Sequence, residues 1–368
     1  MRVQVPLGPR SYEIVVVTGR PDLFGAFARG ALDRTWAGSA CRSALIVTDS
    51  HLADLALPAT YQAACAGAGI EPAITILPAG EKTKSLDHLS RLYDELVSRK
   101  ADRHTLIVAL GGGVIGDLAG FLAATYARGL PLLMVPTTLL AQVDSSVGGK
   151  VGINHPEAKN AIGAFHQPVG VWIDTETLRT LPIRELRCGL AEVVKYGVIL
   201  DSELFATLER IADDLLSRDD RALRAVVSES CRKKASVVAR DEREESGLRA
   251  ILNFGHTIGH AIESVAGYGG PYQHGEAVAV GMVAESRLAE RLGWIGADVT
   301  LRVVRLLERL GLPTAAPGLD PDRLLDAIAR DKKNRRGKLH FVLPRSIGVV
   351  ELTDEATLED VRSVLKDL

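Results

Sequence analysis

The sequence is 368 residues long, with 44 Lys and Arg against 46 Asp and Glu and a hydrophobic content of 46%. This length exceeds a typical domain of about 100–150 residues, so two domains are expected and a small disulfide-stapled scaffold is excluded. The balanced charge and the apolar content exclude a disordered chain and a general polyanion-binding surface, so nucleic acid is not expected as a main partner.

Neither a membrane span nor a signal peptide is expected. The sequence lacks a run of about 18 apolar residues, and its first residues are not a basic region followed by an apolar stretch. Its four cysteines lie far apart without a CxxC pair, at positions 41, 65, 188 and 231. This spacing indicates reduced thiols rather than a disulfide framework or a thiolate metal site, so we expect a cytoplasmic protein.

Short apolar runs rich in β-branched residues recur through the first half of the sequence, at residues 13–19, 44–49, 72–81, 105–113 and 130–138. Apolar residues at helical spacing occupy 62–69 and 85–101, between these runs. This alternation predicts a mainly parallel sheet covered by helices, a Rossmann-like α/β domain over residues 1–180.

After about residue 181 the strand rhythm stops. The apolar spacing becomes helical over long segments, at residues 183–200, 202–216, 221–239 and 276–293. A strand-like exception at 338–352 is expected to be a small hairpin or a returning loop. The sequence therefore predicts a second, mainly α-helical domain over residues 181–368.

A glycine-rich turn follows the fourth expected strand. Gly111, Gly113 and Gly116 fit G-x-G-x-x-G and precede a helical stretch, which is the setting in which backbone N–H groups and a helix N-terminus approach a pyrophosphate. The acidic residue usual at the end of the next strand is missing, because that region reads VPTTLL. Two interpretations stay open, a dinucleotide site and a tight turn that needs glycine. Asp49, which ends another expected strand, could hold the adenine ribose.

Histidines and a carboxylate on apolar helices suggest a metal site. His256 and His260 stand four residues apart on one helix face, a spacing with which two imidazoles can share a metal, and His274 begins another helix. Glu192 and Lys195 stand three apart on an apolar helix, where burying both charges would be costly without a partner. One carboxylate with two imidazoles is typical of a catalytic zinc site. The alternatives are satisfied core histidines and an internal ion pair between Glu192 and Lys195.

Cations recur in apolar or glycine-rich surroundings and would suit a small substrate with more than one negative charge. They are Arg128, Lys150, Lys159, Lys234 and Arg249. If residues 249–256 formed one helix, Arg249 and His256 would share a face about 10 Å apart along its axis.

Several blocks in order resemble the 3-dehydroquinate synthase family, the shikimate-pathway branch of the sugar phosphate cyclases, from about Asp49 to beyond Lys338. The blocks are GEKTKS (80–85), GGGVIGDLAGF (111–121), VPTTLLAQVDSSVGGKVGIN (135–154), KNAIGAFHQP (159–168), GLAEVVKYG (189–197), LNFGHTIGHAIE (252–263) and HGEAVAVGM (274–282). The resemblance implies that the N-terminal domain binds NAD and that the helical domain carries a zinc or cobalt ion and most substrate groups.

Residue by residue, the resemblance implies Glu192, His256 and His274 as metal ligands, with His260 on the substrate side. The implied NAD contacts are Asp49, Glu81, Lys84, Gly113, Val114, Gly116, Asp117, Thr137, Thr138, Lys150, Lys159, Thr177 and Thr180. The implied substrate and catalytic residues are Asp144, Lys150, Asn160, Lys195, Lys234, Arg249, Asn253 and His260, with Lys338 beside Lys332 and Lys333. Arg128 would reach a neighbouring subunit's site, which implies a homodimer.

The activity implied by the resemblance is a carbon–oxygen lyase reaction. A 3-deoxy-D-arabino-heptulosonate 7-phosphate becomes 3-dehydroquinate and phosphate through oxidation by NAD, elimination, re-reduction and aldol closure. Another sugar phosphate cyclase is one alternative, although such enzymes tend to differ at positions matching Asn160, Asn253 and His260. An iron- or zinc-dependent polyol dehydrogenase is a second, disfavoured by the lack of an Asp-x-x-x-His pair. A catalytically dead scaffold protein is a third, and it would be expected to have lost metal or lysine positions that are present here.

Overall fold

The computed structural model of the chain describes residues 1–35, 41–267, 270–333 and 339–368. Its contacts divide the chain into two compact units. The first holds Met1–Leu181 with Leu223–Arg243, and the second holds Pro182–Ala222 with Glu244–Leu368. The chain thus passes from the first unit to the second after Leu181, and residues 223–243, which the prediction placed in the second domain, group with the first unit.

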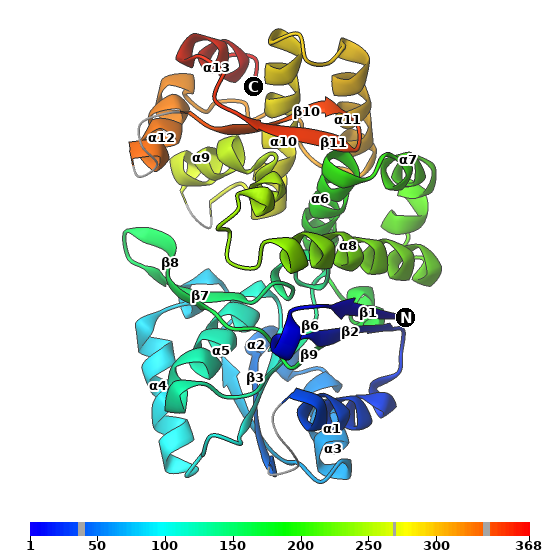
Figure 1. The fold of residues 1–368 in the computed structure, drawn as a ribbon, viewed down its shortest axis with the longest axis vertical. Helices are drawn as coiled ribbons and strands as arrows, with labels where there is room; N and C mark the ends of the chain where they lie inside the picture. Colours follow the sequence, from blue (N-terminus) through cyan, green and yellow to red (C-terminus); the bar gives the residue numbers. More distant parts are fainter. Residues whose placement is uncertain (36–40, 268–269, 334–338) are drawn as a thin grey trace. The chain divides into compact units, whose positions relative to one another are not determined.

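A seven-stranded sheet organises the first unit (Figure 1). Its order is β1-β2-β9-β6-β5-β3-β4, and every neighbouring pair is parallel except β1 with β2. The strands are β1 Arg2–Val5, β2 Tyr12–Val17, β3 Ser43–Asp49, β4 Glu71–Leu77, β5 Leu106–Gly111, β6 Leu132–Pro136 and β9 Gly170–Asp174. The mainly parallel sheet predicted from the apolar runs is confirmed, and the five predicted runs correspond to β2 to β6.

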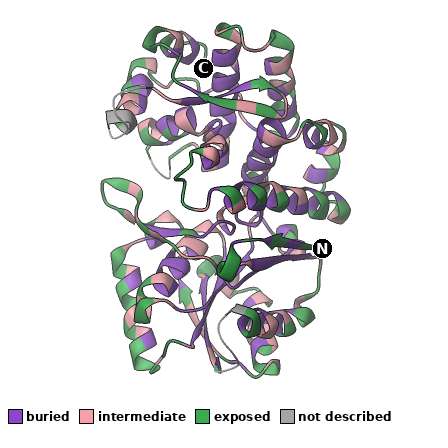
Figure 2. Cartoon of the chain, viewed as in Figure 1, coloured by how far each residue is buried: buried purple, intermediate pink, exposed green. Residues whose placement is uncertain are grey.

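Helices accompany this sheet, as expected for parallel strands that are buried on both faces. They are α1 Phe24–Thr35, α2 Ser50–Ala53, α3 Leu57–Gly67, α4 Leu86–Ser98, α5 Gly113–Thr125 and most of α8 Asp220–Arg240. Figure 2 shows the central strands buried, and β5, β6 and β9 are buried at every residue. Phe24 packs edge-on against Tyr61 and Trp172 in the core beside the sheet.

A separate antiparallel hairpin, formed by β7 (Lys150–His155) and β8 (Ala158–Phe165), follows β6 and was not predicted. Its strands approach closely, because a Cβ atom on Gly152 would lie 2.6 Å from the carbonyl oxygen of Ile162. The hairpin also packs on α5, where a Cβ atom on Gly120 would lie 2.3 Å from Val151. Small residues therefore hold β7 against the helix that follows the glycine-rich turn.

The second unit is mainly helical, as predicted. Its helices are α6 Ile183–Leu200, α7 Ser202–Leu216, α9 His256–Ala266, α10 His274–Arg291, α11 Ala297–Arg309, α12 Pro321–Lys333 and α13 Leu358–Leu365. Helix α10 is buried along most of its length (Figure 2). A Cβ atom on Gly281 would lie 1.9 Å from the Gly255 carbonyl oxygen, and one on Gly275 would lie 2.3 Å from that of Cys188. These two glycines let α10 approach the start of α9 and the middle of α6.

The strand-like segment near the C-terminus forms an antiparallel hairpin of β10 (Phe341–Ser346) and β11 (Val349–Thr353), so the hairpin alternative is confirmed. Among the helices that the structure describes, none is long and apolar enough to span a bilayer. All four cysteines are buried thiols.

Candidate active site

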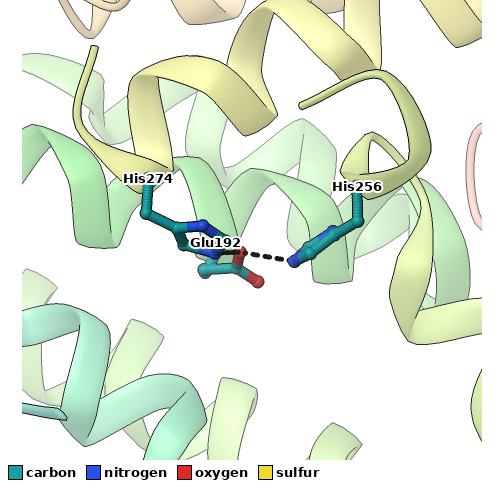
Figure 3. Close-up of side chains that lie close together, drawn as sticks. All are labelled: Glu192, His256 and His274. Carbon is teal, nitrogen blue, oxygen red and sulfur yellow. Dashed lines mark ion pairs between the residues drawn. The ribbon is translucent and has the colours of Figure 1, made fainter. Parts of the chain in front are cut away.

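Three helices of the second unit bring a carboxylate and two imidazoles together (Figure 3). Glu192 lies on α6, His256 is the first residue of α9 and His274 is the first residue of α10. The Nε2 atoms of His256 and His274 lie 3.4 Å and 3.8 Å from Glu192 Oε1. One possible ligand atom from each residue lies within 4.8 Å of the others. The structure thus gathers the three residues that the family resemblance implies as metal ligands.

The donor set fits a divalent metal such as zinc. Glu192 is fully buried, and apart from its ion pair with Lys195 neither of its carboxylate oxygens has a hydrogen-bond donor among the described residues. His256 Nδ1 lies 3.1 Å from the Phe254 carbonyl oxygen, and His274 Nδ1 lies 3.1 Å from Glu263 Oε2. When Nδ1 donates to an oxygen, the Nε2 lone pair is left for a metal, which is the usual arrangement around zinc-binding histidines.

Burial also keeps His256 suited to metal binding. Its pKa lies well below the ordinary value because the ring is desolvated and because the Lys195 ammonium is nearby. The neutral imidazole, which is the form that binds metals, is therefore favoured. The ion pair considered between Glu192 and Lys195 is present as well, so the same carboxylate faces both an ammonium and two imidazoles.

Glu263 is a site residue that the sequence analysis did not assign. It lies on α9, seven residues after His256, and its buried carboxylate contacts His274. The helical repeat from His256 through His260 to Glu263 could have indicated a shared face. His260 is exposed, and its ring centroid lies 5.4 Å from that of His256. With Glu263 and His274 it forms a second group with possible ligand atoms within 4.8 Å.

The segment before α9 does not continue that helix, so residues 249–256 do not form the single helix that the sequence analysis considered. Residues Leu248–Asn253 form a 3-10 helix, Phe254 is extended, and Gly255 has φ +78° in the left-handed region. The expectation that one helix face carries Arg249 and His256 is therefore wrong, because the backbone leaves the helical conformation at Phe254 and Gly255. Arg249 is buried and pairs with Glu244 at 3.5 Å, while Asn253 ends the 3-10 helix.

A buried carboxylate from α10 holds this turn. Glu285 is fully buried, its Oε2 accepts the Gly255 N–H at 2.6 Å and its Oε1 accepts the Ile258 N–H at 3.4 Å. Since the first N–H groups of a helix have no partner within the helix, Glu285 caps α9 from a neighbouring helix. The cap fixes the turn from which His256 projects.

In the first unit, most of the residues implied as NAD contacts follow the ends of parallel strands. In parallel α/β sheets this carboxyl edge is where ligands bind. Gly111 ends β5, and α5 begins at Gly113 without a side-chain cap. A Cβ atom on Gly113 would lie 3.2 Å from Ser145 Oγ, so the turn is close to its neighbours. The uncapped N–H groups and the side-chain-free turn fit a dinucleotide pyrophosphate.

The other implied NAD contacts follow further strands of the same sheet. Asp49 ends β3 and caps α2 by accepting the His51 N–H at 2.9 Å. Six further residues of this set lie on α5 or after β6 and β9, and they are Val114, Gly116, Thr137, Thr138, Thr177 and Thr180. Thr137 donates its N–H to the Gly111 carbonyl at 3.0 Å, which ties the end of β6 to the glycine-rich turn.

A polar network joins the GEKTKS segment to α5 and the hairpin. Lys84 is buried, and its Nζ donates to Asp117 Oδ2 at 2.7 Å and to Asn160 Oδ1. Glu81 Oε1 lies 3.8 Å from the same ammonium. Burial raises the pKa of Asp117, and the Lys84 ammonium acts in the opposite direction. Three implied cofactor contacts and one implied substrate contact are therefore neighbours.

Other implied substrate residues are placed as follows. Lys234 on α8 is buried and donates to Asp144 Oδ1 at 2.8 Å and to the Asp144 carbonyl oxygen at 2.7 Å. Lys150 is exposed at the start of β7 and Lys159 lies on β8. Arg128 is exposed in a turn, with φ +66°. Lys338 lies outside the described residues, as do the side chains of Lys332 and Lys333.

Comparison with known proteins identifies the family. The model for the 3-dehydroquinate synthase N-terminal domain matches residues 74–188, and that for the C-terminal domain matches residues 189–334. The chain is 50% identical over 364 residues to the 3-dehydroquinate synthase of Desulforamulus reducens, covering 99% of each chain. The chain belongs to the 3-dehydroquinate synthase family.

Solved structures of related cyclases share this fold. The 2-epi-5-epi-valiolone synthase of Streptomyces hygroscopicus subsp. jinggangensis 5008, solved with NAD+ and Zn2+, matches with a TM-score of 0.86 and 30% identity over 97% of this chain and 96% of that one. A 2-deoxy-scyllo-inosose synthase, complexed with carbaglucose-6-phosphate, NAD+ and Co2+, matches with a TM-score of 0.86 and 27% identity over 100% of this chain and 99% of that one. The α/β unit and the helical unit together are therefore those of 3-dehydroquinate synthases and related cyclases.

Proposed function

We propose that the protein is a 3-dehydroquinate synthase, a carbon–oxygen lyase that converts 3-deoxy-D-arabino-heptulosonate 7-phosphate, here called the heptulosonate phosphate, into 3-dehydroquinate and phosphate. The observation that carries the proposal is the Glu192, His256 and His274 cluster within a chain 50% identical to such a synthase over its full length. The proposal extends to a cytoplasmic homodimer in the shikimate pathway, with Arg128 reaching the partner's site.

The residues of the second unit would bind a metal and the substrate. Glu192, His256 and His274 would hold zinc or cobalt through one carboxylate oxygen and two Nε2 atoms. Arg249, buried beside Glu244, would pair with the substrate carboxylate through its two-pronged guanidinium. His260, exposed next to the cluster, would donate to a phosphate oxygen.

The residues of the first unit would bind the cofactor and the phosphate. The carboxyl edge of the sheet would hold NAD, with its pyrophosphate at the uncapped start of α5 and its ribose at Asp49. Lys150 and Asn160 on the hairpin would bind the substrate phosphate, and Lys234 would help to bind its carboxylate. When bound, NAD would supply the hydride acceptor and later the hydride donor, and the metal would supply a Lewis acid for the substrate hydroxyl that is oxidised.

Two rival functions are less well supported. A cyclase for substrates without a carboxylate is opposed by the sequence identities, because the valiolone and inosose synthases share 30% and 27% identity with this chain, against 50% for the dehydroquinate synthase. A polyol dehydrogenase would release NADH, and its uncharged substrate would not call for the cations Arg249 and Lys234, which here pair with Glu244 and Asp144.

The experiment that tests the proposal is phosphate release by the zinc-loaded protein from the heptulosonate phosphate with substoichiometric NAD. Because oxidation is followed by reduction, we expect many turnovers per NAD and no net NADH. Steady NADH accumulation in step with product would favour the dehydrogenase. Faster phosphate release from sedoheptulose 7-phosphate would place the protein in another branch of the cyclases.

A further inference from the structure

Asn154, on β7, connects the groups that surround Lys84. Its side-chain Nδ2 donates to Glu81 Oε1 at 2.8 Å, and its Oδ1 accepts the backbone N–H of Asn160 at 2.8 Å. Its own backbone N–H donates to the Lys84 carbonyl oxygen at 2.9 Å. Together with the Lys84 contacts to Glu81 and Asn160, these bonds close a ring of four residues, in which Asn160 takes part through its side chain and its backbone N–H.

The ring requires a side chain with both a donor and an acceptor. An asparagine amide offers both from one planar group, whereas aspartate only accepts and alanine does neither. Asn154 is half-buried, so its bonds are shielded from water better than those of an exposed residue. Asparagine at this position is therefore matched to one acceptor and one donor at the same time.

The backbone of Asn160 needs support of this kind. Asn160 lies on β8 with φ +55°, in the left-handed region that residues with a Cβ adopt at an energetic cost. Its exposed side chain is directed to Lys84, and its N–H is held by Asn154. Without Asn154, the backbone that presents Asn160 would lose an anchor on the neighbouring strand.

We propose that Asn154 is a positioning residue that ties the cofactor side of the first unit to its phosphate side. One arm of its amide holds Glu81, a proposed NAD contact, and the other holds Asn160, a proposed phosphate contact. This inference rests on the proposed function. Since both polar groups of its amide already bond Glu81 and Asn160, Asn154 would act through these two residues in binding NAD and the heptulosonate phosphate.

Two substitutions distinguish the bond to Glu81 from the bond to Asn160. Asn154→Ala removes both, so the Kd of NAD and the KM of the heptulosonate phosphate should each rise about fivefold or more, the value of one net hydrogen bond. Asn154→Asp keeps an acceptor for the Asn160 N–H but sets a carboxylate against Glu81. The aspartate variant should therefore weaken NAD binding at least as much as the alanine variant does. Its KM for the heptulosonate phosphate, measured at saturating NAD, should stay within about twofold of wild type.

The measurements are isothermal titration of the zinc-loaded protein with NAD alone, steady-state phosphate release and the melting temperature. The matched control is His155→Ala on the same hairpin, because His155 is exposed and its ring accepts the nearby Glu157 N–H at 3.2 Å. It should change neither constant. The split between NAD affinity and KM in Asn154→Asp is a result that loss of hairpin stability alone would not give.

Three results would overturn the inference. They are unchanged Kd and KM in Asn154→Ala, equal KM losses in the alanine and aspartate variants, and losses in His155→Ala as large as those at Asn154. Failure of the proposed function is separate, since it would show in the wild-type protein as no phosphate release from the heptulosonate phosphate.

Discussion

Replacing the buried cap of α9 should loosen the metal site without touching a metal ligand. In Glu285→Ala, the Gly255 and Ile258 N–H groups lose their acceptor inside the protein, where water cannot replace it. The left-handed turn at Gly255 then loses a stabilising hydrogen bond. His256 is the next residue, so its position becomes less fixed. We expect lower stability of the second unit and weaker zinc binding together.

The magnitude follows from the contacts. The 2.6 Å bond to Gly255 is charge-assisted and contributes about 1.5–3 kcal/mol, and the 3.4 Å bond to Ile258 contributes less. With the cavity left by the carboxyl group, the free energy of unfolding should fall by about 3–5 kcal/mol. For a unit of about 150–250 residues, each kcal/mol lowers the melting temperature by about 2–4 °C, so a shift of about 6–20 °C is expected.

The assay is differential scanning calorimetry with and without zinc, together with metal analysis after dialysis. Glu285→Gln keeps one carbonyl acceptor, so its melting temperature and zinc content should lie between those of wild type and of Glu285→Ala. Glu290→Gln, on the same helix and half-buried, is the control and should melt like wild type. A Glu285→Ala protein that melts within about 2 °C of wild type and keeps full zinc would refute the capping argument.

Three further predictions concern the site and the thiols. Glu192→Gln should lose metal and activity together, as read by metal analysis and phosphate release, and should melt lower because buried Lys195 loses its counter-ion. Full metal content would exclude Glu192 as a ligand. Arg249→Lys should lower kcat/KM on the heptulosonate phosphate by about 10- to 150-fold with unchanged zinc, since lysine lacks the two-pronged geometry; an indifferent variant would remove the carboxylate contact. Native protein should react slowly with a disulfide reagent at neutral pH, because burial raises the pKa of Cys65 to about 11 and those of Cys188 and Cys231 to about 12. Rapid labelling of these thiols would contradict their burial.

The parallel sheet was predictable because its strands are continuous apolar runs, as in strands buried on both faces. The β7–β8 hairpin was not, since it is short of large apolar residues and depends on Gly152 approaching the Ile162 carbonyl across the strands. The grouping of α8 with the first unit could not be predicted from the sequence either. A helical period shows that a face is buried but not which unit buries it.

The candidate active site was also predictable only in part. The family blocks pointed to Glu192, His256 and His274, and the structure brings these three together. Glu285 and Asn154 emerged only from the structure, because each acts through contacts with residues distant in sequence. Local spacing also misjudged the segment before His256, since nothing in LRAILNFGH shows that Gly255 takes a left-handed conformation.

The late return of the chain to the first unit affects how this protein folds as it is synthesised. Asp144 meets Lys234 only after 90 further residues have been added, and Arg10 pairs with Glu242 across 232 residues at 2.6 Å. A nascent chain that ends at Leu181 therefore holds the strands of the large sheet but lacks α8 and these two ion pairs. The N-terminal unit is the first to begin folding, yet it cannot be completed until about two-thirds of the protein has left the ribosome.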